Sequence, residues 1–284
     1  MILREALQSV TETLHGITIA DASVEAELLL GQVLGMCKTQ LYTEAERDLT
    51  STEMERLGHL VQRRLDHEPA AYILGQCEFY GIDFYIDSHT FIPRPETELL
   101  VEKAVERAQR ISRRGEQITI ADIGTGCGAI AISLALALPE AKIYATDISV
   151  PALEVAAVNC RRHGVDGHVE LLQGNLLACL PRVVDMVVAN LPYIRECEFE
   201  DLSLEIRDYE PVMSWAGGED GLDKIREMLE QMPGKLSCGA CFLLEIGQGQ
   251  GKCVCSLVEK HFPQASIELI PDLGGIERVV KVVL

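Results

Sequence analysis

The chain has 284 residues and a formal charge of -19, from 25 lysines and arginines against 44 aspartates and glutamates. An acidic chain repels phosphate backbones, so free nucleic acid is not an expected substrate. The longest apolar run, residues 129–138, is too short for a bilayer, which takes roughly 20 residues, and the first residues do not resemble a secretory signal. We therefore expect a cytoplasmic monomer that does not bind membranes.

Residues 1–70 have the apolar spacing of a small helical bundle. Asp21 can cap one helix, and Thr50 with Glu53 forms a capping-box pattern ahead of another. The first helix is marked by an apolar stripe of Leu3, Leu7, Val10 and Leu14. Such periodicity suits either a structural cap or a docking module, and we assign these residues to a substrate-docking domain.

Residues 71–90 are rich in aromatic and β-branched residues punctuated by glycine, which predicts a β-hairpin linker. In the third predicted domain, residues 91–284, strand and helix patterns alternate, as in an α/β fold with a mostly parallel sheet covered on both faces. Because only a loop joins the last two strands, the sheet should end in one reversed strand. Strands are expected at 118–123, 142–146, 169–172, 184–189, 241–246, 265–270 and 276–283, and helices at 127–138, 150–163, 220–232 and 249–261.

The first of these strands runs into the segment Asp122-Ile-Gly-Thr-Gly-Cys-Gly128. Its glycines allow a tight turn and a close backbone approach to a ligand, ahead of a helix N-terminus. The spacing G-x-G-x-G differs from the G-x-G-x-x-G of dinucleotide folds. Asp122 can interact, directly or through water, with a cationic amino-acid group, which S-adenosylmethionine has and NAD lacks. The segment therefore favours S-adenosylmethionine as the cofactor.

Two polar residues follow the next strands along the chain. Asp147 ends the second strand, where a carboxylate can accept hydrogen bonds from both hydroxyls of a ribose. Asn175 follows the third strand and is placed to meet an adenine edge, although a loop-capping role is equally compatible with its position. Together with the glycine segment, these residues predict a nucleotide-like cofactor at one edge of the sheet.

The segment Asn190-Leu191-Pro192-Tyr193 closes the fourth strand at that same edge. The Asn190 carboxamide oxygen and the following carbonyl are two acceptors that match the two N–H donors of a planar –NH2 group. Held in this way, a weakly nucleophilic amide nitrogen can be aligned with a sulfonium methyl, and the developing positive charge is stabilised. The alternative is a simple turn with a buried tyrosine ring.

These motifs, and above all Phe91-Ile-Pro-Arg-Pro-Glu-Thr-Glu98, resemble the HemK/PrmC family of peptide chain release factor glutamine N5-methyltransferases. The resemblance extends over nearly the whole chain. It includes Tyr72-Ile-Leu-Gly75, Glu210-Pro211, Gly217-Gly-Glu-Asp-Gly-Leu222 and Asp272-Leu-Gly-Gly-Ile-Glu-Arg278.

The resemblance implies a class I, Rossmann-like methyltransferase fold with a seven-stranded sheet. It implies methyl transfer from S-adenosylmethionine to the glutamine of the Gly-Gly-Gln motif in class I release factors. The catalytic residues would be Asn190, Leu191, Pro192 and Tyr193. The cofactor would be bound by Phe91, Arg94, Asp122, Gly124, Thr125, Gly126, Cys127, Gly128, Asp147, Ile148, Asn175, Leu176 and Asn190.

Leu191 departs from the family pattern, which usually has proline at this position. The carbonyl group survives the change, and Pro192 still biases Leu191 toward an extended backbone. We therefore expect the grip on the substrate amide to persist with a less rigid loop.

Three other functions remain as alternatives. An adenine N6 amino group is also a planar –NH2, so a nucleic-acid amino-group methyltransferase is the main one, although the negative charge opposes it. A non-catalytic protein that binds release factors or ribosomes would not need the glycine segment, Asp147 and Asn190. NAD-dependent oxidoreduction is disfavoured by the glycine spacing.

The ten cysteines are predicted to be reduced thiols, because most lie within apolar patterns. A zinc site is a minor alternative for one group of four, Cys238, Cys241, Cys253 and Cys255. Cys241 opens a predicted strand, and Cys253 and Cys255 lie in a predicted helix, so we expect no metal.

Overall fold

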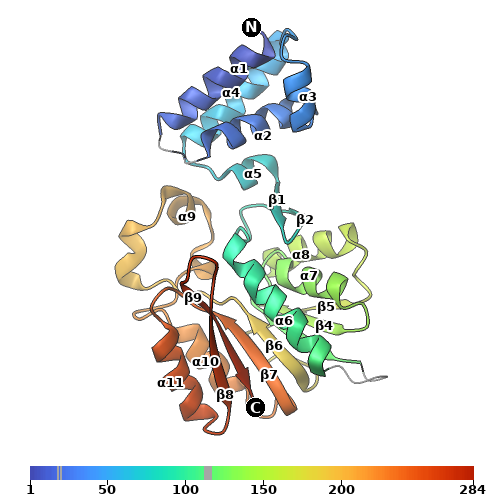
Figure 1. Ribbon diagram of the computed structural model, residues 1–284, viewed down its shortest axis with the longest axis vertical. Helices are drawn as coiled ribbons and strands as arrows, with labels where there is room; N and C mark the ends of the chain where they lie inside the picture. The colour runs from blue at the N-terminus through green and yellow to red at the C-terminus, as the bar shows by residue number, and fades with distance from the viewer. Residues whose placement is uncertain (18, 20, 112–116) are drawn as a thin grey trace. The chain divides into compact units, whose positions relative to one another are not determined.

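The computed structural model describes residues 1–17, 19, 21–111 and 117–284, which form two compact units (Figure 1). The helical unit comprises Met1–Gln76 and Leu204–Tyr209, and the sheet unit comprises Cys77–Ser203 and Glu210–Leu284. This division differs from the predicted boundaries. Most of the predicted hairpin linker belongs to the sheet unit. A short segment from the middle of the third predicted domain belongs to the helical unit.

The helical unit is built from short amphipathic helices, as their apolar spacing predicts. Thr50 and Glu53 form the expected capping box, with Glu53 N 3.3 Å from Thr50 Oγ1 and Thr50 N 2.8 Å from Glu53 Oε2. Asp21 occupies an N-cap position, but its side chain makes no capping hydrogen bond. The helices are α1 (Leu3–His15), α2 (Ala22–Leu34), α3 (Lys38–Thr43), α4 (Ser51–Leu65), α5 (Ala70–Leu74) and α9 (Leu204–Tyr209).

One apolar cluster fills the helical unit, and the predicted stripe of the first helix belongs to it. Leu3, Val10 and Leu14 are buried, and Leu7 packs at the margin. The other buried members are Ala6, Ala22, Ala26, Leu29, Leu30, Val33, Leu41, Leu57 and Ile73.

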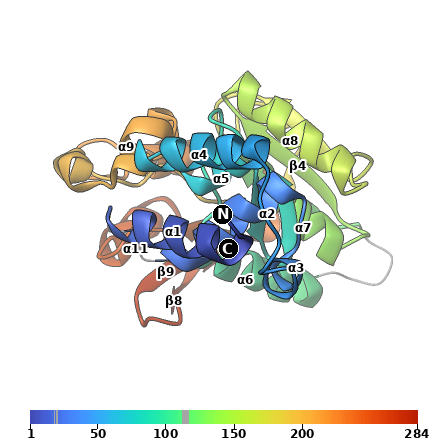
Figure 2. The same ribbon diagram turned by 90° about the horizontal axis from the view of Figure 1, so that it is seen from above.

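A buried arginine attaches α9 to the other helices. The Arg64 side chain, only 2% exposed, contacts Glu25 through Nε and Glu205 of α9 through Nη2, both at 2.5 Å. The Tyr209 hydroxyl donates a hydrogen bond to the Asp66 carbonyl at 2.7 Å. Figure 2 shows α9 near α4 and α5. These contacts explain why Leu204–Tyr209 joins a unit whose other residues all precede Cys77.

The sheet unit alternates strands and helices. Its strands are β1 (Gln76–Phe79), β2 (Ile82–Tyr85), β3 (Thr119–Ile123), β4 (Lys142–Asp147), β5 (Val169–Gln173), β6 (Val184–Ala189), β7 (Leu236–Glu245), β8 (Ser266–Pro271) and β9 (Glu277–Val283). Its α-helices are α6 (Glu98–Ile111), α7 (Ala129–Ala137), α8 (Val150–Arg162), α10 (Asp223–Gln231) and α11 (Gly251–His261). Its 3-10 helices are η1 (Pro95–Thr97), η2 (Glu196–Asp201) and η3 (Val212–Ser214).

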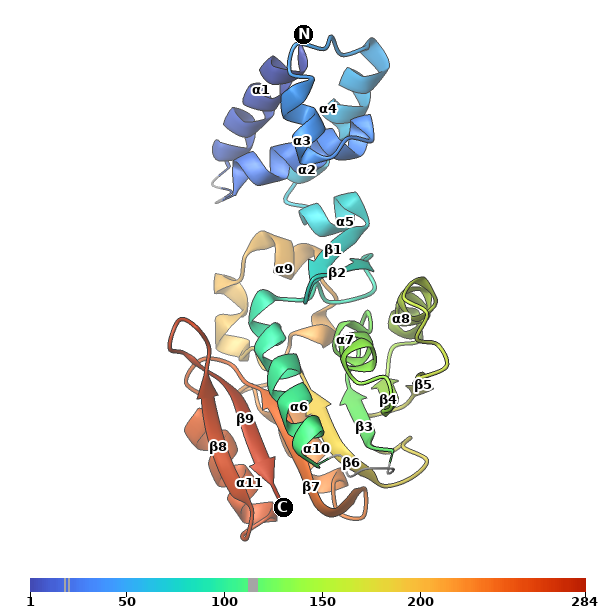
Figure 3. The same cartoon turned by 45° about the vertical axis from the view of Figure 1, so that its right-hand side comes forward.

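The seven strands β3–β9 form one sheet in the order β5-β4-β3-β6-β7-β9-β8. Only β9 is reversed, which confirms the prediction of a single antiparallel strand. Its place differs from the prediction, because β9 lies between β7 and β8 and not at the edge of the sheet. Helices α6, α7 and α8 cover one face, and α10 and α11 cover the other (Figure 3).

Apolar strand residues fill the space between the sheet and its helices, as expected for a sheet buried on both faces. Examples are Ile123, Val187 and Leu244, each no more than 1% exposed. In parallel pairing, Ile123 of β3 lies opposite Ala189 of β6, and Ala189 lies opposite Leu244 of β7. The residues that follow these three strands therefore meet at one edge of the sheet.

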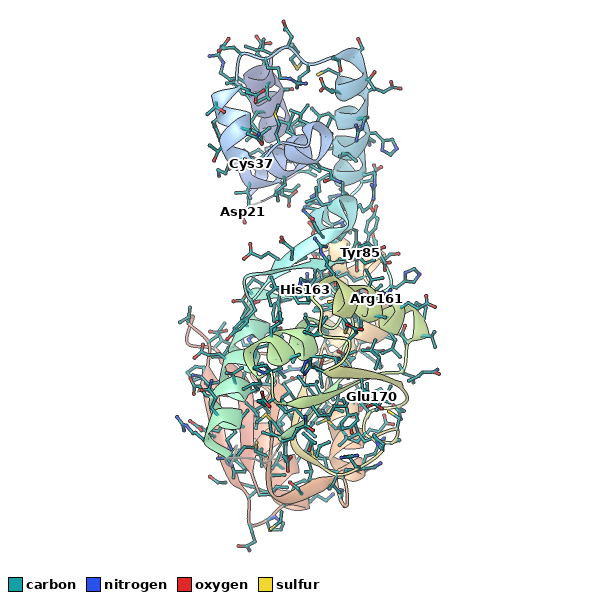
Figure 4. The ribbon with its side chains drawn as sticks, turned by 90° about the vertical axis from the view of Figure 1, so that its right-hand side faces the viewer. Asp21, Cys37, Tyr85, Arg161, His163 and Glu170 are labelled. Atoms are coloured by element: carbon teal, nitrogen blue, oxygen red, sulfur yellow. The ribbon has the colours of Figure 1, made fainter. Side chains whose placement is uncertain are left out.

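The strands β1 and β2 form the predicted hairpin, which is attached to α8. The Asn159 side chain accepts a hydrogen bond from Tyr85 N at 2.7 Å and donates to the carbonyls of Tyr85 and Cys127, both at 2.9 Å. The His163 ring bonds the Asp83 carbonyl at 2.9 Å. Figure 4 shows Tyr85 in the same region as Arg161 of α8 and His163, which follows that helix. The hairpin and the glycine segment are thus held by one buried asparagine.

None of the described helices has both the length and the apolar character that crossing a membrane requires. Within the described ranges, no group of three or more histidines, cysteines and acidic residues is arranged to hold a metal ion.

The contacts of Arg64 give a prediction about stability. Arg64→Ala would leave the Glu25 and Glu205 carboxylates without their common partner, and removing one member of a buried ion pair costs about 3–5 kcal/mol. Arg4→Ala is the control, because Arg4 and Glu46 are 64% and 72% exposed and exposed pairs contribute about 1 kcal/mol or less. Urea unfolding should separate the two variants, and equal losses would show that the Arg64 contacts contribute little.

Candidate active site

A cavity of about 240 Å³ lies at the carboxyl edge of the sheet unit. Most of the predicted site residues line it. They are Phe91, Gly124, Thr125, Gly126, Cys127, Asp147, Ile148, Asn175, Leu176, Asn190, Leu191, Pro192 and Tyr193. Arg94, Asp122 and Gly128 are not among the residues that line the cavity, and their role in cofactor binding stays a prediction.

The glycine segment is fixed to the neighbouring strand by its backbone. Gly124 N and Thr125 N both donate to the Thr146 carbonyl at 2.9 Å, and Gly126 N donates to Asp147 Oδ2 at 2.9 Å. Gly128 has φ +87°, and a Cβ there would lie 3.0 Å from a methyl carbon of Ile132. Glycine at this position thus permits both the turn and the close start of α7.

Asp122 lies beneath the glycine segment and is fully buried. Its Oδ2 accepts hydrogen bonds from Thr125 Oγ1 at 2.6 Å and from Ala131 N at 3.1 Å. Within the described part of the chain its Oδ1 has no hydrogen-bond partner. Burial raises the pKa of Asp122 to about 7, despite these hydrogen bonds. Asp122 therefore braces the segment through Thr125 and can act on a bound cation through its charge.

Asp147 lies at the end of β4 and lines the cavity. Its Oδ1 accepts from Ser149 N and its Oδ2 from Gly126 N, both at 2.9 Å. Burial raises the pKa of Asp147 and outweighs the hydrogen bonds from Ser149, Gly126 and Ile148, which lower it. A carboxylate has about four lone-pair sites, so about two remain for the vicinal hydroxyls of a ribose.

Asn175 and Leu176 continue the wall beyond β5. The Asn175 amide nitrogen donates to Glu227 of α10, which leaves the carboxamide oxygen as the acceptor available to a ligand. Leu176 has φ +53°, an uncommon value for a residue other than glycine. Its side chain lines the cavity, as do those of Ile148 and Ile130. These residues offer an apolar slot with one polar edge, which suits a purine base.

Asn190 follows β6 and is oriented by a hydrogen bond. Its Nδ2 donates to Thr97 Oγ1 at 3.1 Å, so the carboxamide oxygen is the atom left to meet a ligand. The Leu191 side chain is 4% exposed and packs against the glycine segment, since a Cβ on Gly124 would lie 3.3 Å from its Cδ2. The Tyr193 hydroxyl donates to Glu245 Oε1 at 3.2 Å. Burial, followed by the charge of Glu245, raises the pKa of Tyr193.

The segment 91–98 contributes to the wall through Phe91, Pro93 and Thr97. Arg94 supports this segment from outside the cavity. Its guanidinium lies 4.5 Å from the centre of the Phe91 ring and pairs with Glu210, which also accepts from Ile92 N at 3.2 Å. The buried Glu210 carboxylate thus connects the two segments that contain Phe91 and Pro211.

The sequence predictions missed several wall residues. These are His89, Thr90, Pro93, Thr97, Ala129, Ile130, Thr146, Ser149, Ala152, Gly174, Ile194, Pro211, Met213, Ser214, Trp215 and Lys224. The motifs already contained Pro93, Thr97 and Pro211. Trp215, the only tryptophan of the chain, reaches the cavity because Ile194 N donates to its carbonyl at 2.9 Å. No local pattern indicates that pairing.

Comparison with known proteins agrees with this geometry. Residues 96–205 match a family model described as "Methyltransferase small domain". A methyltransferase from Pyrococcus furiosus has a similar structure, with a TM-score of 0.51 and 17% sequence identity over 78% of this chain and 96% of that one. The fold and the site thus define a class I methyltransferase, for which S-adenosylmethionine is the methyl donor.

The full length of the chain identifies its family. Residues 5–75 match a model described as "PrmC N-terminal domain". A release factor glutamine methyltransferase from Koribacter versatilis is 38% identical over 99% of this chain and 98% of its own length. One from Moorella thermoacetica is also 38% identical, over 98% and 97%. The chain belongs to the release factor glutamine methyltransferase family, and it is an S-adenosylmethionine-dependent enzyme.

The raised pKa of Asp122 gives a prediction about cofactor binding. The positive charge of S-adenosylmethionine should favour the ionised carboxylate, so binding lowers the pKa of Asp122 from about 7. Binding should then release protons just below that pH, and affinity should rise with pH until the free site is itself ionised, above about 7. Calorimetry in buffers of different ionisation enthalpy measures this release. Asp122→Asn should reduce it, and the same release from both proteins would contradict the assignment.

Proposed function

We propose that this protein transfers the methyl group of S-adenosylmethionine to the side-chain amide nitrogen (N5) of the glutamine in the Gly-Gly-Gln motif of class I release factors. The names of the related proteins support a release-factor glutamine as the acceptor. One structural observation carries the proposal. Asn190, with its amide nitrogen occupied by Thr97, lines the same cavity as the glycine segment and Asp147.

Methyl transfer to a carboxamide nitrogen depends more on how that nitrogen is positioned than on a strong base. A carboxamide nitrogen is a weak nucleophile because its lone pair is delocalised into the carbonyl. The Asn190 side-chain oxygen and the Leu191 carbonyl can accept its two N–H groups, which fixes the nitrogen and stabilises the positive charge that develops on it. Bound S-adenosylmethionine supplies an electrophilic methyl group on sulfur. The sulfur would keep the electron pair of the broken C–S bond, and the methylated nitrogen would lose one N–H proton to solvent.

The side of the cavity near residues 211–215 suits a protein loop as the acceptor. Met213 lines the cavity and is still 57% exposed, and Val212 beside it is 56% exposed. These apolar side chains offer contact area without the positive charge that a nucleic acid would require. The chain carries 19 more acidic than basic residues. We therefore favour a release-factor loop over an adenine base and propose that the protein acts in the cytoplasm, where termination takes place.

Methyl transfer to a release factor tests the proposal. With labelled S-adenosylmethionine, label should appear on the release factor and not on a DNA duplex. Mass spectrometry should find a gain of about 14 mass units at the Gly-Gly-Gln glutamine, as replacement of one hydrogen by methyl requires. In Asn190→Ala the rate should fall by about 10²–10³, the cost of losing one charge-stabilising partner. The affinity for S-adenosylmethionine in that variant provides the control for folding.

Labelled DNA with an unlabelled release factor would replace the proposed acceptor with a nucleic acid. An unchanged rate in Asn190→Ala would leave the release factor as the proposed methyl acceptor. It would show that the Asn190 oxygen does not hold the substrate amide during methyl transfer.

A further inference from the structure

A buried carboxyl group lies behind the candidate catalytic residues. Glu245 is the last residue of β7 and is 1% exposed. Since Ala189 and Leu244 are opposite each other in neighbouring strands, Asn190 and Glu245 both occupy the next position along the sheet. Glu245 lies in none of the sequence motifs on which the family resemblance rests.

Two hydroxyl groups lower the pKa of this carboxyl. The Tyr193 hydroxyl donates to Oε1 at 3.2 Å. The Thr97 hydroxyl also interacts with the carboxyl and lowers its pKa. Thr97 is itself only 4% exposed, so water has little access to its side chain. An ionised carboxylate has no proton to give, so both hydroxyls must donate to it.

This direction of donation determines how Asn190 is turned. A hydroxyl has one hydrogen and two acceptor lone pairs. Once Thr97 donates its hydrogen to Glu245, its oxygen can only accept from Asn190. The Asn190 group that points to Thr97 is then Nδ2, at 3.1 Å, and the carboxamide oxygen is available to the substrate. A reversed carboxamide would present N–H groups to the N–H groups of the substrate, and these repel.

We propose that Thr97 and Glu245 are positioning residues, which fix the Asn190 carboxamide with its acceptor oxygen toward the substrate amide. The inference rests on the proposed function. Neither residue needs to touch the reacting atoms, because both act through Asn190. Tyr193 is held in the same network, and its carbonyl accepts from Gln250 Nε2 at 2.9 Å.

The charge of Glu245 makes the network sensitive to pH. Burial raises the pKa of Glu245 to about 7, while Thr97, Arg278 and Tyr193 lower it and Glu96 raises it. A protonated Glu245 becomes a hydrogen-bond donor, and the Thr97 hydroxyl is then free to donate to Asn190. The maximal rate should therefore fall as pH decreases through about 7. Measuring at saturating S-adenosylmethionine limits the contribution of Asp122.

Thr97→Val and Thr97→Ser test the positioning role directly. Valine keeps the volume but cannot accept from Asn190, so kcat for the release factor should fall about 10- to 100-fold, as small misplacements do. KM for S-adenosylmethionine should change little. Serine restores the hydroxyl and should recover most of the lost kcat. Equal losses in the two variants would show a packing role and overturn the inference.

Thr119→Val is a matched control. The Thr119 hydroxyl donates to Asp185 Oδ2 at 2.7 Å, but it lies at the start of β3, at the opposite end of the strand from the glycine segment. This variant also breaks a threonine–carboxylate bond and should leave kcat within about twofold, since a remote substitution does not alter the geometry of the site. A loss equal to that of Thr97→Val would attribute the effect to general destabilisation and contradict the inference.

Glu245→Gln tests the second positioning residue. Glutamine keeps the shape, but it has no protonation step and offers only one acceptor group. The variant should have a lower kcat at pH 8 and no decrease of kcat near pH 7. A wild-type decrease that persists in Glu245→Gln would overturn the role of Glu245. If wild-type protein methylates no release factor, the proposed function fails. If it does, and Thr97→Val and Glu245→Gln retain its kcat and its pH profile, only this inference fails.

Discussion

Parallel pairing of β3 with β6 is the constraint on which the site depends. The register sets Ile123 opposite Ala189, so the glycine segment and Asn190 leave the sheet side by side. A Cβ on Gly124 would lie 3.9 Å from the Asn190 carbonyl oxygen, which shows how closely the two segments approach. The cofactor and acceptor regions are therefore placed by backbone hydrogen bonds. The loops add the polar groups but do not set the spacing between the two regions.

The carboxyl edge of the sheet also contains two carboxyl groups whose burial by itself is energetically unfavourable. Asp122 and Glu245 are both buried at strand ends, and burial raises the pKa of each to about 7. Each has one oxygen without a hydrogen-bond partner within the part of the chain that the structure describes. Unsatisfied buried polar groups reduce stability and often mark functional sites. In this protein each bonds a segment of the cavity wall, Asp122 through Thr125 and Glu245 through Tyr193.

Much of this architecture can be predicted from the sequence, because strand periodicity and glycine spacing are local signals. The alternation of strands and helices, the capping box at Thr50 and the clustering of Asp147 with Asn190 follow from such signals. The position of β9 inside the sheet does not, since local patterns give no pairing order. The attachment of α9 to the helical unit depends on Arg64 and Glu205, which are far apart in sequence.

Local sequence patterns also predict the site only in part. Motifs identify the residues that face the cavity, such as Asn190 and Gly126. They do not reveal the residues that hold those side chains in place. Arg94 belongs to a motif, yet it supports Phe91 and Glu210 and does not line the cavity. Glu245 belongs to a buried strand and has no distinctive neighbours in sequence, so only the pairing of β6 with β7 places it behind Asn190.

The structure of the protein with bound S-adenosylmethionine and a Gly-Gly-Gln peptide tests the central claim most directly. The account predicts that Asp147 bonds the ribose hydroxyls and that the Asn190 oxygen lies about 3 Å from the glutamine nitrogen, with the methyl carbon directed at that nitrogen. A cofactor bound outside this cavity, or a methyl group directed away from Asn190, would contradict it.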